Sequence, residues 1–424
     1  MSTPFRREKI GENIYFSYLA DDKFNQNMLV VNFILPVEED KLSERAILPE
    51  VLRNGCKAYP SLLSLNRRLA DLYGARLSTG AERIGDRQVI RMGIRCLGNQ
   101  FAFDGEDVLS SCGELILDCL LNPLLDENGL FDKTSVELEK ANLIYEIKDE
   151  INDKRSYSLI RCREELLKGK KASLRLNGTL ENASRVTPRG LKEAYDEMLS
   201  NARIEVMLAG KDEPKGLSQL FARGFKNIKR NKLDYQKEAY EEHIGEVKEI
   251  KETMDVAQAK LVLGMKLKNG EVDRIAMPAM VDLFGGDPTS LLFRNVREKL
   301  SLCYYCTARY TKETRAIYVD CGILPENKEK AQAEIMNQLQ KVKNGEFSDE
   351  DLDNIKKSRE AALDSALDSL THIHKWYFAR VANDDDLTLE EAKEKIKGLT
   401  REDIIACAKM VDLDTVFFLT GEDK

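Results

Sequence analysis

Histidine is scarce in this 424-residue chain, and its distribution is uneven. The sequence contains three histidines, His243, His372 and His374, so the first 242 residues have none. Imidazole nitrogens are the usual ligands of a catalytic zinc ion that lowers the pKa of its bound water. A histidine-based metal site is therefore excluded from the first half of the chain.

Several other features are also missing. The longest apolar run, residues 28–37, is interrupted by Asn32 and Pro36 and is too short to span a bilayer. The first residues lack the apolar stretch of a signal peptide, so we expect a cytoplasmic protein without membrane attachment. The net charge of −8 argues against general nucleic-acid binding. The nine cysteines show no paired metal spacing, and Cys303 and Cys306 are expected to face opposite sides of a strand.

The chain does contain a repeated order of strands and helices. Residues 46–55 (AILPEVLRNG) and 276–285 (AMPAMVDLFG) both read as helices with an early proline and a terminal glycine. In both halves an apolar strand precedes this helix, and a second helix and a strand follow it. We therefore predict an α+β fold of two duplicated units, each an antiparallel sheet packed with helices. The predicted domains are 1–225 and 247–424, joined by a charged, aperiodic linker at 226–246.

The stretch 283–310 has the most distinctive pattern in the chain. Gly285 and Gly286 suit a tight turn, and residues 288–300 read as a helix whose buried stripe is Leu292, Val296 and Leu300. Arg297 lies one residue off that stripe. After Ser301 the period changes to two, which predicts a strand with Leu302, Tyr304 and Cys306 on one face. The guanidinium of Arg297 and the phenol of Tyr304 are thus expected to lie close together. The composition also fits a plain helix–strand connection with a surface arginine and a core tyrosine.

These residues resemble the C-terminal signature of a known enzyme family, the pitrilysin/insulinase family of zinc metallopeptidases. That family includes the mitochondrial processing peptidases and their two-subunit bacterial relatives. The resemblance rests on Gly285-Gly286, Ser290-Leu291-Leu292-Phe293, Arg297-Glu298-Lys299, Leu302 and Tyr304. It implies a half-clamshell fold in which Arg297 and Tyr304 hold and polarise a substrate peptide. The zinc ion would then be carried by a different half of the assembly.

The first unit departs from the family at the metal site. The family carries the inverted motif H-x-x-E-H, and the matching segment GCKAYP (55–60) sets the register here. Ala46 and Glu50 then stand at the two histidine positions, and Pro49 stands at the catalytic glutamate. Glu139 and Glu146 keep the family spacing of seven, but without histidines they are better explained as solvated helix glutamates, with Glu146 a remnant of a ligand. No metal is expected in this chain.

Two remaining motifs carry little chemistry. His372 and His374 alternate in a helical region, which places them on different faces and disfavours a two-histidine metal site. Gly285-Gly286-Asp287 lacks the Gly-Lys-Ser/Thr of a phosphate-binding loop.

The sequence thus predicts a non-catalytic, substrate-binding subunit of a heterodimeric zinc-dependent peptidase. Its expected partners are a zinc-bearing subunit of the same family and a peptide substrate. The alternative is a catalytically silent scaffold or a peptide-binding homodimer of the same fold. A self-sufficient peptidase would need histidines that the first half lacks. The substrate, and the choice between processing and degradation, stay open.

Overall fold

The structure is a computed structural model that describes residues 5–231, 235, 237–240, 242–243 and 245–421. The chain forms two compact units. The first contains the residues up to Lys148 together with Leu174–Lys237 and Ala366–Asp385, and the second contains Asp149–Ser173, Glu238–Ser365 and the residues from Asp386 onward. The boundary at 237/238 falls inside the predicted linker, of which residues 232–234, 236, 241 and 244 lie outside the described part. The units differ from the predicted contiguous domains because each contains a segment from the other half of the chain.

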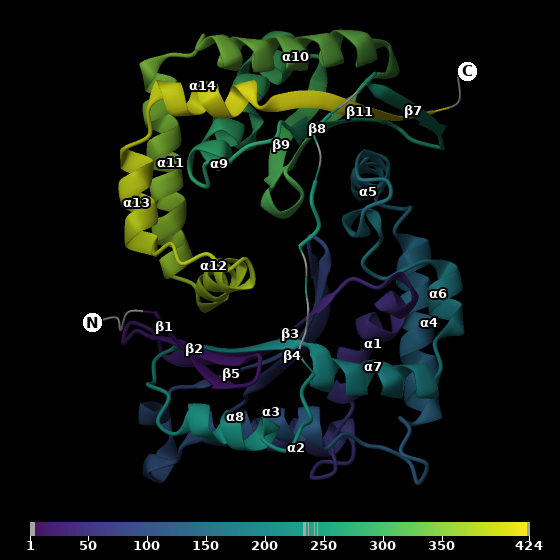
Figure 1. The fold of residues 1–424 in the computed structure, drawn as a ribbon, viewed down its shortest axis with the longest axis vertical. Helices are drawn as coiled ribbons and strands as arrows, with labels where there is room; N and C mark the ends of the chain where they lie inside the picture. The colour runs from purple at the N-terminus through teal and green to yellow at the C-terminus, as the bar shows by residue number, and fades with distance from the viewer. Residues whose placement is uncertain (1–4, 232–234, 236, 241, 244, 422–424) are drawn as a thin grey trace. The chain divides into compact units, whose positions relative to one another are not determined.

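The first unit is built on a six-stranded sheet in the order β1-β2-β6-β3-β5-β4 (Figure 1). Its strands are β1 (Arg6–Gly11), β2 (Ile14–Ala20), β3 (Gln26–Pro36), β4 (Arg76–Ile84), β5 (Arg87–Leu97) and β6 (Arg203–Gly210). The β2–β6 pair is parallel, whereas the other pairs are antiparallel. The nearly continuous apolar sequence of β3 is typical of a central strand covered on both faces, and β3 indeed lies between β6 and β5.

Helices cover both faces of this sheet. They are α1 (Leu42–Arg53), α2 (Leu62–Asp71), α3 (Val108–Leu121), α4 (Lys133–Asp149), α6 (Leu180–Arg185), α7 (Pro188–Asn201), α8 (Leu217–Phe225) and α12 (Leu370–Ala382). Figure 1 shows α3 and α8 side by side on one face, where Phe16, Phe33, Phe221 and Phe225 form part of the core, and α12 on the other face. The unit thus has three layers around its sheet.

The second unit repeats the strand order of the first. Its sheet runs β7-β11-β8-β10-β9, with a parallel pair β7–β11 and antiparallel pairs elsewhere. The strands are β7 (Lys248–Thr253), β8 (Ala259–Leu267), β9 (Cys303–Thr311), β10 (Ala316–Ile323) and β11 (Val411–Thr420). The helices are α5 (Lys154–Leu166), α9 (Ala276–Val281), α10 (Lys328–Asn344), α11 (Asp349–Leu367), α13 (Leu389–Lys397) and α14 (Arg401–Lys409). Because β2-β6-β3-β5-β4 has the same order and the same parallel pair, the predicted duplication is confirmed.

The two segments exchanged between the halves are equivalent in the repeat. Helix α5 follows α4, helix α12 follows α11, and each packs on the sheet that is built from the other half of the chain. On α5, Cys162 and Leu166 are buried against β8 at Gly264, where an added Cβ would lie 3.0 Å from the Cys162 sulfur. Hydrophobic periodicity identifies the buried face of such a helix but does not identify the sheet that covers it.

The described residues include no helix that is both long and apolar enough to cross a bilayer.

The two neighbouring histidines of α12 have different environments. His372 is exposed, whereas His374 is only 4% exposed and its Nε2 lies 3.5 Å from the Asn32 amide nitrogen. The prediction that they face different sides of a helix is confirmed. Burial, reinforced by the positive charges of Arg91 and Lys375, lowers the pKa of His374 to about 4.

This buried imidazole predicts a loss of stability in mild acid. The unfolded chain protonates His374 near its ordinary pKa of about 6.5, whereas the folded chain does so only near 4, so the unfolded state binds more protons between these values. The free energy of unfolding should fall by about 2 kcal/mol between pH 7.5 and 5 from this group alone. Urea unfolding of His374→Leu at both pH values should show a correspondingly smaller drop. The variant His372→Gln should behave as wild type; parallel pH dependence in all three proteins would contradict the prediction.

Candidate functional site

The stretch that carries the candidate arginine contains two π-helical segments. They are η5 (Asp282–Gly286) and η6 (Phe293–Lys299), and the N–H of Leu300 donates to the Asn295 carbonyl at 3.1 Å, five residues back. Leu292 and Val296 are buried as predicted, but Leu300 is 46% exposed, so its place in the buried stripe was wrong. The reason is the wider turn, because a five-residue hydrogen-bond spacing moves later residues off a stripe predicted for an α-helix.

Gly285 allows this segment to approach strand β9 closely. An added Cβ on Gly285 would lie 2.5 Å from Leu292 Cδ1 and 2.9 Å from the Cβ of Ala308. Any side chain there would push η5 away from the sheet. The predicted tight turn is therefore absent, and the glycine serves close packing behind the candidate site.

Tyr304 is the extra residue of a β-bulge. Across the β9–β10 pair, Tyr305 lies opposite Gly322 and Cys303 opposite Ile323, which leaves Tyr304 without a partner residue. Its side chain is 61% exposed, whereas Cys303 and Cys306 are both buried. A bulge resets the alternation of faces and re-aims one side chain. The predictions that Tyr304 shares a face with Cys306, and that the two cysteines face opposite sides, were wrong for this reason.

Arg297 and Tyr304 both present unused hydrogen-bond donors. Arg297 is exposed, and its guanidinium carbon lies 4.5 Å from the centre of the Phe293 ring. Within the part of the chain that the structure describes, no hydrogen bond or ion pair engages this guanidinium or the Tyr304 hydroxyl. The two side chains do not contact each other there, so their convergence on one peptide stays a prediction. Their donors are nevertheless available to a ligand.

An ion pair between the partly exposed Arg155 and the buried Asp320, next to this site, was not predicted. On β10, Asp320 is buried and accepts a hydrogen bond of 2.5 Å from Arg155 Nε and one of 2.8 Å from the Thr307 hydroxyl. The Arg155 guanidinium also lies 4.2 Å from the centre of the Tyr305 ring. This cluster attaches α5 to the sheet that carries Tyr304. A single aspartate within the apolar stretch 316–324 was the one sequence signal for it.

The degenerate zinc positions lie on α1 and α4. Ala46 and Pro49 have no side-chain donor for a metal, and Glu50 accepts a 2.8 Å hydrogen bond from the Thr79 hydroxyl. On α4, Glu139 accepts a hydrogen bond from Asn142, and Glu146 is exposed. Among the described residues, no group of three His, Cys, Asp or Glu side chains is arranged to hold a metal ion. These residues do not fit a tetrahedral zinc ion.

Comparison with known proteins gives a consistent result. The model of a family described as "Peptidase M16 inactive domain" matches residues 185–359, which include Arg297 and Tyr304. A protein of Bacillus subtilis named "Probable inactive metalloprotease YmfF" is 28% identical over 404 residues, covering 95% of this chain and 94% of that protein. This chain is therefore similar to proteins of the M16 peptidase family. The metallopeptidase resemblance predicted from the stretch around Arg297 is thereby confirmed.

Solved structures share the M16-type fold along the whole chain. A conserved protein from Enterococcus faecalis V583 superposes with a TM-score of 0.89 at 22% identity, covering 100% of both chains. A protease from Helicobacter pylori gives a TM-score of 0.81 at 16% identity, covering 98% of this chain and 99% of that one. At these identities the similarity establishes the fold and leaves the activity to be argued from the site.

Proposed function

We propose that this chain is the non-catalytic, substrate-binding subunit of a two-chain zinc peptidase. The observation that carries the proposal is the contrast between its two candidate sites. The metal positions on α1 hold Ala46, Pro49 and Glu50, whereas Arg297 and Tyr304 keep exposed donors without a partner in the described structure. The descriptions "inactive" of the matching family model and of the Bacillus relative support the first half of this contrast.

The two donors suit different moments of peptide hydrolysis. The Arg297 guanidinium would hold a backbone carbonyl of the substrate through a charge-assisted hydrogen bond. The Tyr304 hydroxyl would donate to the carbonyl oxygen of the cleaved bond while negative charge develops on it. The partner subunit would supply the zinc ion and the glutamate that activates water. A division of this kind requires a heterodimer, because the first 242 residues of this chain contain no histidine to bind the zinc ion.

The position of Tyr304 on an outer strand supports peptide binding. Within the described residues β9 pairs only with β10, so it is an edge strand of its sheet, the kind of strand to which an extended peptide can add. The bulge places an exposed phenol on that strand without disturbing the buried cysteines on either side. A substrate backbone at this edge would meet the donor directly.

Co-purification followed by reconstitution tests the proposal. The tagged chain should bring down a second protein that contains H-x-x-E-H, and the pair should cleave peptides in a chelator-sensitive way. Each subunit alone is the control, and metal analysis of this chain should find no stoichiometric zinc. One tightly held zinc per isolated chain together with peptidase activity would refute the proposal. A stable homodimer that binds peptides without cleavage would favour the scaffold alternative instead.

A further inference from the structure

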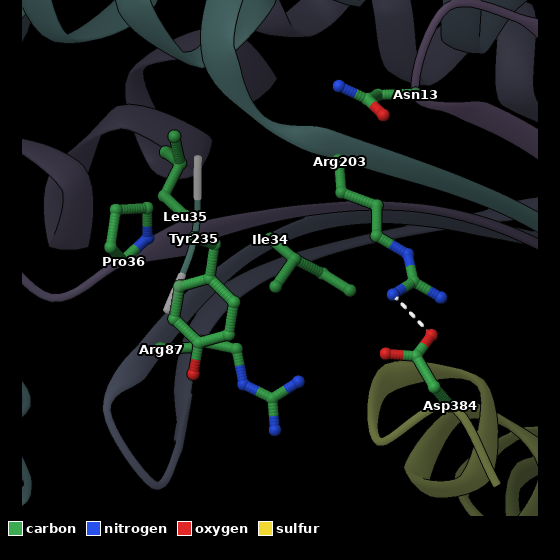
Figure 2. Close-up of a pocket in the computed structure, with 8 residues that line it drawn as sticks. All are labelled: Asn13, Ile34, Leu35, Pro36, Arg87, Arg203, Tyr235 and Asp384. Carbon is green, nitrogen blue, oxygen red and sulfur yellow. Dashed lines mark hydrogen bonds and ion pairs between the residues drawn. The ribbon is translucent and has the colours of Figure 1, made fainter. Parts of the chain in front are cut away.

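A small cavity in the first unit has charged walls and an apolar floor (Figure 2). Its volume is about 150 Å³, and its lining includes Ile34 and Pro36 at the end of β3, with Arg87, Arg203, Tyr235 and Asp384 around them. A cavity of about this size in another protein holds a molecule as large as benzene. The lining therefore combines room for a short apolar group with two guanidinium groups.

Among the described residues, Arg87 is a buried cation without an anionic partner. It is 6% exposed, and one guanidinium nitrogen donates to the Asn383 side-chain oxygen at 2.7 Å while the other donates to the Ala382 carbonyl. Both acceptors are neutral. Among the described residues no carboxylate forms an ion pair with Arg87, and its buried Nε–H has no hydrogen-bond partner. Buried charges in proteins are normally paired, so this side chain indicates a missing anion.

Arg203 shows that a carboxylate fits at the same cavity. Its Nη1 donates to the Asp384 carboxylate at 2.8 Å, as Figure 2 shows, while its other nitrogens donate to Glu205 and to the Val381 carbonyl. Asp384 itself is 78% exposed, so little holds it in place besides this pair. An exposed carboxylate held in this way is one that a ligand carboxylate in the same cavity would compete with.

We propose that this cavity binds a monocarboxylate with a short apolar tail. The carboxylate would pair with the Arg87 guanidinium, and the tail would pack on Ile34, Pro36 and the Tyr235 ring. Arg203 is already paired with Glu205 and Asp384, which leaves Arg87 as the cation in the lining that no described carboxylate neutralises, and this suits a monoanion. The ligand is either the C-terminus of a peptide that ends in an aliphatic residue or a free branched short-chain acid. This site is independent of Arg297 and Tyr304.

Titration calorimetry with three probes tests the site. N-acetyl-leucine represents a peptide C-terminus, 4-methylpentanoate represents a free acid, and N-acetyl-leucinamide has no carboxylate. At least one acid should bind and the amide should not. Binding of acetyl-leucine alone assigns the site to peptide ends, and binding of the simple acid alone assigns it to free acids. Equal binding of the amide, or no binding of either acid at about 10 mM, would overturn the proposal.

Two variants with opposite expected effects separate binding from folding. Arg87→Lys loses the planar fork and should weaken acid binding about tenfold or more. Asp384→Asn removes the internal competitor and should tighten binding several-fold. Asp368→Asn is the matched control, because Asp368 is also an exposed partner of a cation, Lys23, and should leave affinity unchanged. Unchanged or weaker binding in Asp384→Asn would contradict the proposed competition even if Arg87→Lys fails to fold.

Discussion

Replacement of Tyr304 by phenylalanine is expected to lower the turnover of the reconstituted two-chain peptidase by a factor of ~100 to 1,000. The substitution removes one O–H donor from the substrate carbonyl at the moment when that oxygen becomes negative. Phenylalanine keeps the ring, and the Tyr304 side chain is largely exposed at a bulge, so folding should not change. The measurement is the turnover number of the variant mixed with the zinc-bearing partner, with thermal melts alongside.

The neighbouring tyrosine provides a matched control. Tyr305→Phe also removes one hydroxyl, but this ring lies against Arg155 and its buried hydroxyl has no partner in the described structure. The turnover of the complex that contains Tyr305→Phe should equal that of the wild-type complex. Arg297→Lys should weaken substrate capture, because it keeps the charge and loses the planar fork. If Tyr304→Phe and Arg297→Lys complexes both keep wild-type turnover, the pair is structural and the silent scaffold becomes the better explanation.

The second large effect concerns stability. Arg155→Met should destabilise the second unit by about 3 kcal/mol, because it leaves the Asp320 carboxylate buried without its cation. The Thr307 hydroxyl still donates to Asp320, so we expect the lower end of the usual range for such a loss. Hydrogen exchange of the β10 amides measures the effect locally, which matters because a chain with two units need not unfold in one step.

Two further variants decide whether the buried charge is the cause. Lys397→Met breaks the exposed pair with Glu394 in the same unit and should leave stability almost unchanged. The double variant Arg155→Met with Asp320→Leu removes both charges and should recover most of the lost stability. If Arg155→Met costs no more than Lys397→Met, the ion pair does not stabilise this unit.

The sequence predicted the fold well where the evidence was local. The central position of the apolar strand β3 followed from its composition, and the repeated element order correctly implied two sheets of one design. The exchange of α5 and α12 could not be predicted, because each helix shows an apolar face without any mark of which sheet it covers. Local pattern therefore determines the elements, and long-range packing determines the units.

The candidate site was predicted only in part, for a related reason. The exposure of Arg297 followed from its place beside the apolar stripe. The exposure of Tyr304 depends on a bulge against Gly322 and Ile323, which are distant in sequence. The Arg87 cavity is assembled from segments near residues 34, 87, 203, 235 and 384, and none of these carries a recognisable motif. Pairing partners and cavities of this kind are properties of the folded chain.

The exchange of α5 and α12 also bears on how the chain is made. A ribosome completes the last strand of the first sheet at Gly210, but the helix that covers one of its faces begins at Leu370, about 160 residues later. At roughly 5 to 20 residues per second this interval lasts about 10 to 30 s. The apolar face of helix α5 likewise stays uncovered until β8 and β11, on which it packs, have been synthesised. A nascent chain therefore carries two unmatched apolar surfaces at once, and this is the period in which chaperones and wrong partners compete for them.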